Sequence, residues 1–127
     1  MNDPRPGASI LLAESDPGLH ETIRVLLRAR GFAVLSAYTP AEIDAQLAEQ
    51  SVDGALIGDV LDGASGFEIA ASLGRRPHGA PPLALLSRRL RRGDPQRARL
   101  AGAGALLTIP LDENALDRWL RAQGIAA

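Results

Sequence analysis

The chain contains no cysteine and no lysine among its 127 residues, and only 3% of the residues are aromatic. Without cysteine there can be no disulfide and no thiolate metal site, so a reducing, cytoplasmic location is expected. Without lysine, every basic side chain is a forked guanidinium, and no compact ammonium group is available for chemistry. The scarcity of aromatic residues predicts a core built from aliphatic side chains.

Long hydrophobic runs are also missing. No segment has the apolar length of a membrane span or the pattern of a signal peptide, so no membrane partner is expected. The length suits a single domain with one core. We predict a flexible N-terminus over residues 1–8, one domain over residues 9–124 and a tail over residues 125–127.

Five short apolar runs alternate with helical patterns along this domain. The runs lie at 9–13, 32–35, 54–58, 83–87 and 106–109. They do not alternate polar with apolar residues, which is typical of strands buried on both faces of a parallel sheet. The sequence therefore predicts an α/β fold, a doubly wound parallel sheet with five βα units and helices on both faces.

The predicted helices have clear start signals. Asp16 and Pro17 form a cap-and-first-turn pair, Thr39 and Pro40 form another, and Asp112 caps the last helix. Asp94 with Pro95 is interpreted as a further cap of this kind. The third helix is predicted over residues 67–73.

The loop after the third strand is the candidate site. Residues 58–66 contain three glycines and two aspartates and follow a buried strand. In open α/β sheets, ligands bind at the carboxyl ends of the strands. Any chemistry of this chain is therefore expected beside this loop.

The ordered set of these features resembles the receiver domains of bacterial response regulators. The set comprises acids after the first strand, an acid-and-glycine loop after the third, Ser87 after the fourth and a residue–proline pair after the fifth. The resemblance implies a flavodoxin-like fold with strand order 2-1-3-4-5. It also implies an aspartate that accepts a phosphoryl group from a histidine kinase, beside acids that hold Mg²⁺ and a conserved lysine.

Position by position, this chain departs from that pattern. Counting from Asp53 or from Gly66 places Gly58, which has no side chain, at the acceptor position. One metal acid corresponds to Glu14 and the other to the neutral Ser15, while Ile109 stands at the lysine position before a proline expected to carry a cis bond. The degenerate site comprises Glu14, Ser15, Asp16, Gly58, Asp59, Ser87, Ile109 and Pro110.

Phosphoryl transfer needs a nucleophile, a divalent ion and a further cation. All three roles are affected here, so we expect a pseudo-receiver that is not an enzyme, needs no cofactor and binds a signalling protein such as a histidine kinase or another receiver. One alternative is that Asp59 accepts the phosphoryl group with Mg²⁺. Another is a divalent ion held by Glu14, Asp16, Asp59 and Asp62, although cap and turn roles also explain these acids.

An arginine-rich segment follows the fourth strand. Residues 87–99 contain six arginines and one acid, whereas residues 1–68 carry an excess of seven acids. Guanidinium groups suit phosphate oxygens and flat bases, and Arg91 with Asp94 matches an Arg-x-x-Asp pattern of cyclic di-GMP-binding proteins. The alternatives are a solvated face or docking of an acidic partner; nucleic acid is not expected. The candidate residues are Arg88, Arg89, Arg91, Arg92, Asp94, Arg97 and Arg99.

Overall fold

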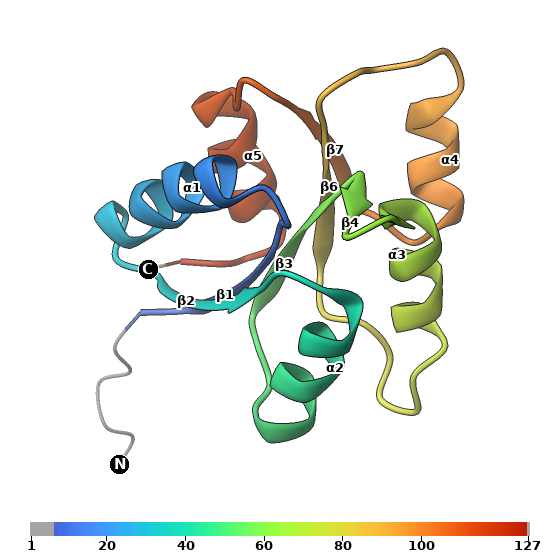
Figure 1. Cartoon of the computed structure of the whole chain (residues 1–127). Helices are drawn as coiled ribbons and strands as arrows, with labels where there is room; N and C mark the ends of the chain where they lie inside the picture. Colours follow the sequence, from blue (N-terminus) through green and yellow to red (C-terminus); the bar gives the residue numbers. More distant parts are fainter. Residues whose placement is uncertain (1–6, 127) are drawn as a thin grey trace.

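Five parallel strands form the central sheet in the order β2-β1-β3-β6-β7 (Figure 1). The computed structural model describes residues 7–126. The strands are β1 (Ser9–Ala13), β2 (Ala33–Ala37), β3 (Gly54–Gly58), β6 (Leu83–Ser87) and β7 (Ala105–Thr108). β6 and β7 are the fourth and fifth strands of the sheet along the chain, so the predicted order 2-1-3-4-5 is confirmed.

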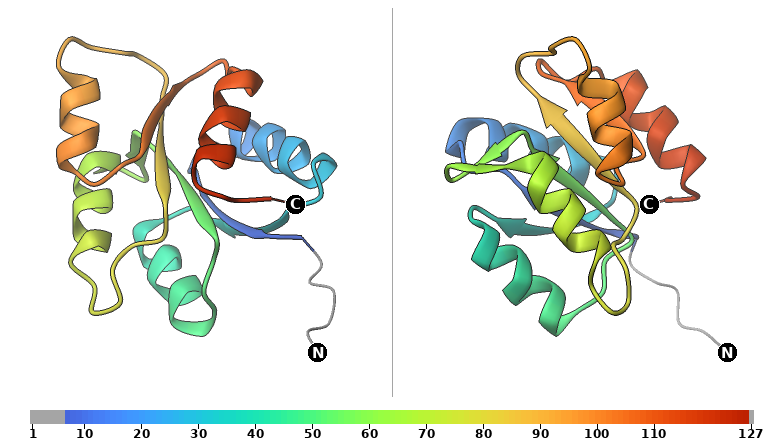
Figure 2. Two further views of the ribbon diagram at one scale, coloured as in Figure 1. Left: turned by 180° about the vertical axis from the view of Figure 1, so that it is seen from behind. Right: turned by 90° about the vertical axis from the view of Figure 1, so that its right-hand side faces the viewer.

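Helices cover both faces of this sheet, as the two views of Figure 2 show. α1 (Pro17–Ala29) and α5 (Glu113–Ala122) lie on one face. α2 (Pro40–Glu49), α3 (Gly66–Gly74) and α4 (Asp94–Leu100) lie on the other. The doubly wound α/β fold is confirmed.

The side chains of each strand alternate between two aliphatic clusters, one under each helical layer. In β1, Ile10 and Leu12 pack with α1 and α5, whereas Leu11 packs with α2 and α3. Trp119 of α5 is buried in the first cluster. A sheet buried on both faces explains why its strands are continuously apolar in sequence.

The helix start signals were correct at three positions and wrong at one. The carboxylate of Asp16 accepts the backbone N–H of Leu19, and Thr39 and Asp112 make equivalent capping bonds. The N-cap of α4 is Gly93, with φ of 88°, and Asp94 is instead the first residue of that helix. The chain turns just before the helix begins, and within this turn the Asp94 carboxylate accepts the N–H of Arg91.

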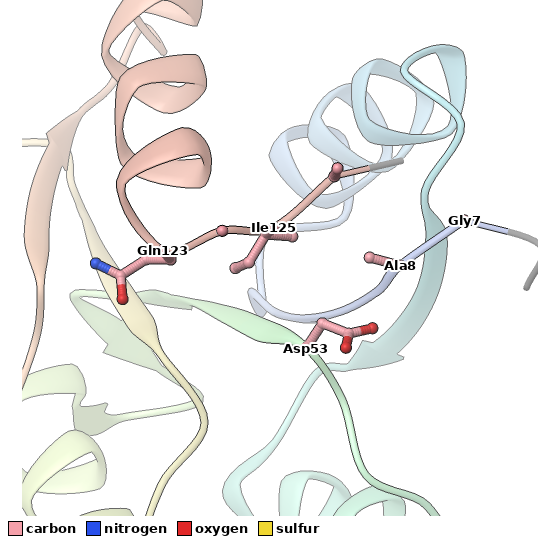
Figure 3. Close-up of a pocket in the computed structure, with 7 residues that line it drawn as sticks. Gly7, Ala8, Asp53, Gln123 and Ile125 are labelled. Carbon is pink, nitrogen blue, oxygen red and sulfur yellow. The ribbon is translucent and has the colours of Figure 1, made fainter.

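The two ends of the described chain meet at the amino-terminal ends of the strands, opposite the predicted site (Figure 3). Asp53, Ala8 and Ile125 line a depression there, and no predicted site residue does so. Ile125 is buried in the core, although it was assigned to the tail. The carbonyl of Ala8 accepts the backbone N–H of Ala33. Residues 1–6 of the predicted flexible N-terminus lie outside the described residues, and so does Ala127.

No helix in the described part of the chain is long and apolar enough to cross a lipid bilayer.

An ion-pair network joins the end of α1 to α5. Arg30 donates to Asp117 at 3.0 Å and to Glu113 at 2.8 Å. The hydrogen bond from Arg30 lowers the pKa of Asp117 below its usual range. The carboxylate form of Asp117 is therefore the one that stabilises the fold.

Asp117→Asn is expected to lower the free energy of unfolding at neutral pH by less than about 1 kcal/mol, because the pair is partly exposed. The contribution is present above the unfolded-state pKa of about 3.9 and disappears as the pH falls through the lower folded-state pKa. Urea unfolding of both proteins between neutral and acidic pH measures this difference. Glu68→Gln, which removes an exposed carboxylate on α3, is the control; a difference that grows on acidification would contradict the assignment.

Candidate functional site

The carboxyl ends of the strands bring the predicted residues to one edge of the sheet. Gly58 ends β3 beside Leu86 of β6, and Ser87 ends β6 beside Thr108 of β7. Glu14 follows directly after β1, the other neighbour of β3. The residues at the ends of these strands are therefore neighbours in space, although they are far apart in sequence.

The Glu14 side chain fills the space in front of Gly58. A Cβ atom added at Gly58 would lie 2.6 Å from Oε1 of Glu14, which is closer than such atoms approach in proteins. Glu14 is only 2% exposed. The position that corresponds to the acceptor thus lacks a side chain, and a neighbouring carboxylate occupies the volume.

Two donors hold the Glu14 carboxylate in this place. Its Oε2 atom accepts the backbone N–H of Asp16 at 2.8 Å and the guanidinium of Arg88 at 3.1 Å. The same guanidinium lies 3.9 Å from the carboxylate of Asp16. A buried carboxylate needs such partners, because an unpaired charge in the interior is strongly unfavourable.

The side chain of Asp59 does not point into the space in front of Gly58. Its two carboxylate oxygens accept the backbone N–H groups of Val60, at 2.9 Å, and of Arg88, at 3.2 Å. Its side chain lines a depression on the α3–α4 side, together with Ser87. Consecutive residues of an extended chain point to opposite sides, so Asp59 does not take the place that Gly58 leaves.

The acids proposed as metal ligands do not gather around one point. No three His, Asp or Glu side chains among residues 7–126 are close enough together to hold a metal ion. Asp16 caps α1, and Asp62 lies in an exposed turn with φ of 49°. Among residues 7–126, Glu14, Asp16, Asp59 and Asp62 are therefore not brought together as one cation site.

The remaining predicted positions lie around the same edge. Ser87 is buried, and its carbonyl accepts the N–H of Ile109. Ile109 packs against the core on the α1–α5 side, so an apolar side chain stands where the resemblance places a lysine. The Ile109–Pro110 peptide bond is cis, as the resemblance implied. Ser15 is half-buried before the first residue of α1.

His20 is a buried polar residue that the sequence did not reveal as part of this edge. Its Nδ1 atom lies 2.8 Å from the carbonyl oxygen of Glu14, and its Nε2 atom 2.8 Å from the hydroxyl of Ser36. A carbonyl can only accept, so Nδ1 carries the proton, and the ring stacks on Tyr38 at 4.1 Å. His20 thereby fixes the backbone of the residue that covers Gly58. Burial of a single histidine leaves no signal in an amphipathic helix pattern.

A short hairpin between β3 and α3 was also missed. β4 (Val60–Leu61) and β5 (Ala64–Ser65) pair across Asp62 and Gly63, which both have positive φ. Asp-Gly is a common turn sequence for two-residue hairpins, so this signal was available. Gly66 then approaches so closely that a Cβ atom would collide with the carbonyl of Gly58.

The arginine-rich segment is divided among three surroundings. Arg88 turns inward to Glu14, as described above. Arg89, Arg91 and Arg97 line the depression that contains Asp59, and the Arg97 guanidinium lies 4.2 Å above the ring of Phe67. Arg99 lines a separate groove beside β7. Arg92 is exposed and lines neither of these two hollows, so the six arginines do not form one continuous surface.

Comparison with known proteins gives matches only at the level of structure. No protein-family model and no curated protein matches the sequence. The structure superimposes on a two-component response regulator from Clostridium difficile with a TM-score of 0.82 and 16% identity, covering 91% of this chain and 94% of that one. Chemotaxis response regulator CheY4 of Vibrio cholerae gives 0.81 and 18%, covering 92% and 98%.

The signal receiver domain of a histidine kinase from Syntrophus aciditrophicus gives a TM-score of 0.80 and 20% identity, covering 91% of this chain and 89% of that chain. This chain has the receiver fold. At these identities the likeness shows the fold alone. The function of the site depends on the residues that this chain places there.

The contact between Gly58 and Glu14 can be tested by substitution. Gly58→Ala is expected to destabilise the protein by about 1–3 kcal/mol, the usual cost of overpacking a core. In a Glu14→Ala background the added methyl group has room, so the cost should largely vanish. Denaturant unfolding of the four proteins of this cycle measures the coupling.

Gly66→Ala provides the matched control. Its methyl group collides with a backbone carbonyl rather than with the Glu14 side chain. The loss of stability from Gly66→Ala should therefore be the same with and without Glu14. Equal costs of Gly58→Ala in both backgrounds would show that Glu14 does not fill the space.

Proposed function

We propose that this chain is a pseudo-receiver: a receiver-like module that is not phosphorylated and acts by binding a protein in two-component signalling. The partner is a histidine kinase or another receiver. The chain is not an enzyme under this proposal, and its output depends on which surfaces it presents.

The observation that carries the proposal is the Glu14 carboxylate over Gly58. In-line attack on a phosphoryl group needs a nucleophilic side chain at the end of β3, and Gly58 offers none. The incoming group would also have to displace a buried carboxylate held by Arg88. Two negative charges in one small volume repel each other, which opposes entry of a phosphoryl group.

The distribution of positive charge around the site supports the same proposal. Arg88 contacts the Glu14 carboxylate and lies near that of Asp16, where the resemblance places Mg²⁺. The apolar Ile109 cannot neutralise a phosphoryl oxygen. Since the loss of one positioned electrostatic group typically costs about 10²–10³ in rate, changes in several roles together argue strongly against transfer.

The binding surface we favour lies around α4 and α5. Leu90 and Leu100 are 55% and 90% exposed, and Leu90 lines a groove with Leu106 beside β7. Exposed leucines close to an apolar groove are typical of a surface that a partner covers. Arg99 at the rim of this groove would favour an acidic partner.

Incubation with acetyl phosphate and Mg²⁺ is expected to add no phosphoryl group, because Gly58 offers no nucleophilic side chain and the Glu14 carboxylate over it is held by Arg88. Intact-mass spectrometry measures the addition, and a receiver with an aspartate acceptor serves as the positive control. Beryllofluoride with Mg²⁺ should likewise leave the amide NMR signals of residues 58–62 unchanged.

Asp59→Asn distinguishes the competing interpretation. An added phosphate that disappears in Asp59→Asn would show that Asp59 is the acceptor and would overturn the proposal. An acyl phosphate elsewhere between β3 and α3 would do the same.

A second candidate function is sensing of cyclic di-GMP or another phosphorylated anion through the arginine-rich segment. One observation favours it: among residues 7–126, only Arg88 of the six arginines in this segment forms an ion pair. The five guanidinium groups that form no ion pair within the described residues attract anions to this side of the molecule.

A further inference from the structure

We propose that Arg89, Arg91 and Arg97 form a site for a nucleotide, whose phosphate they bind and whose base stacks on Arg97. This inference rests on the second candidate function and identifies which part of the arginine-rich segment carries it. The site lies beside Asp59, on the α3–α4 side of the molecule, and is separate from the groove beside β7.

The three guanidinium groups line one depression of about 280 Å³. Its walls come from the β4–β5 hairpin, from the first turn of α3 and from the chain between β6 and α4. This volume is near the lower end of the range of roughly 300–1,000 Å³ for small-molecule sites. It suits one mononucleotide, or one half of a dinucleotide.

No carboxylate among residues 7–126 forms an ion pair with these guanidinium groups. The ion pairs between residues 7 and 126 use four other arginines: Arg24, Arg30, Arg76 and Arg88. Three like charges around one depression repel each other. A phosphate with several oxygen acceptors relieves that repulsion, and a guanidinium binds two such oxygens at once.

The two carboxylates of the depression are already engaged by backbone donors. Both oxygens of Asp59 accept N–H groups, and Oδ2 of Asp94 accepts the N–H of Arg91. Asp94 is also buried. These acids shape the loop around the depression and keep their negative charges, so the three guanidinium groups exceed the two acids lining it by one positive charge.

A planar surface lies next to the charged groups. The guanidinium carbon of Arg97 lies 4.2 Å from the centroid of the Phe67 ring, so the two side chains are in cation–π contact. Arg97 is also exposed, so a flat ring can reach its guanidinium group from solvent. Guanidinium groups stack readily on aromatic rings. A ligand that has both a phosphate and a planar base would use this surface as well as the charges, and nucleotides are the class with both.

The test is calorimetric titration of the full chain at low salt with pyrophosphate, guanosine monophosphate and cyclic di-GMP as separate probes. We expect saturable binding of at least one nucleotide, and weaker binding of pyrophosphate. Arg91→Ala and Arg97→Ala should each weaken nucleotide binding about tenfold or more, as for the loss of one charge-assisted contact. Arg97→Lys should weaken the nucleotide while leaving pyrophosphate nearly unchanged, because the charge remains and the planar face is lost.

Arg99→Ala is the matched control, since it removes an arginine of the same helix that lines a different groove. It should change affinity less than about threefold, within the effect expected of a distant, screened charge. Thermal unfolding of each variant shows whether it is folded.

An equal loss in Arg99→Ala and Arg91→Ala would overturn this site while the segment as a whole still bound anions. Pyrophosphate binding as tight as nucleotide binding would contradict the base contact. No binding of any probe up to about 1 mM, the affinity of a negligible site, would overturn both the site and the second candidate function.

Discussion

The ion pair between Glu14 and Arg88 determines what the carboxyl edge of this sheet can hold. Glu14 is buried, and its charge is tolerated there because Arg88 and the N–H of Asp16 satisfy it. The Arg88 side chain is half exposed, so it is the buried Glu14 that would lose most if Arg88 were removed, because an unpaired charge in the interior is unfavourable. In this arrangement a side chain larger than glycine at position 58 would have to displace the Glu14 carboxylate.

The same pair joins segments that are distant in the chain. Glu14 follows β1, and its carbonyl oxygen is hydrogen-bonded to the ring of His20. Arg88 follows β6, and its backbone N–H donates to the carboxylate of Asp59. The β1–α1 turn, the loop after β3 and the loop after β6 are thus fixed to one another by internal charges. Under our proposal, these loops hold a constant arrangement without a bound metal or phosphate.

The sequence predicted the architecture well because the fold depends on local and periodic signals. The apolar strands indicated a parallel sheet, and three of the capping residues gave the starts of α1, α2 and α5, whereas the strand order was implied by the resemblance to receiver domains. Gly58 was placed by its spacing from Asp53 and Gly66, and the close approach of Gly66 to the Gly58 carbonyl gives that spacing a physical reason. The Asp62–Gly63 hairpin could have been predicted from its turn sequence but was not.

Other features of the site depend on tertiary packing and had no signal in the sequence. Whether Glu14 turns inward depends on Arg88, which is 74 residues away. The division of the arginines among three surroundings depends on where the loop after β6 turns, and Asp94 was misread because its carboxylate bonds to Arg91 rather than capping α4. In the sequence alone, an aspartate that caps a helix cannot be distinguished from one whose carboxylate closes a loop.

The most direct measurement of the central claim is an NMR titration of the full chain with Mg²⁺, comparing the unmodified protein with Arg88→Ala. If the Arg88 guanidinium stands in the place of a metal, the unmodified protein should show no saturable shifts of the Glu14 and Asp16 amides at millimolar Mg²⁺. Arg88→Ala should show them, because its carboxylates have lost their cation. Tight Mg²⁺ binding to the unmodified protein, with shifts centred on Glu14 and Asp16, would contradict the account.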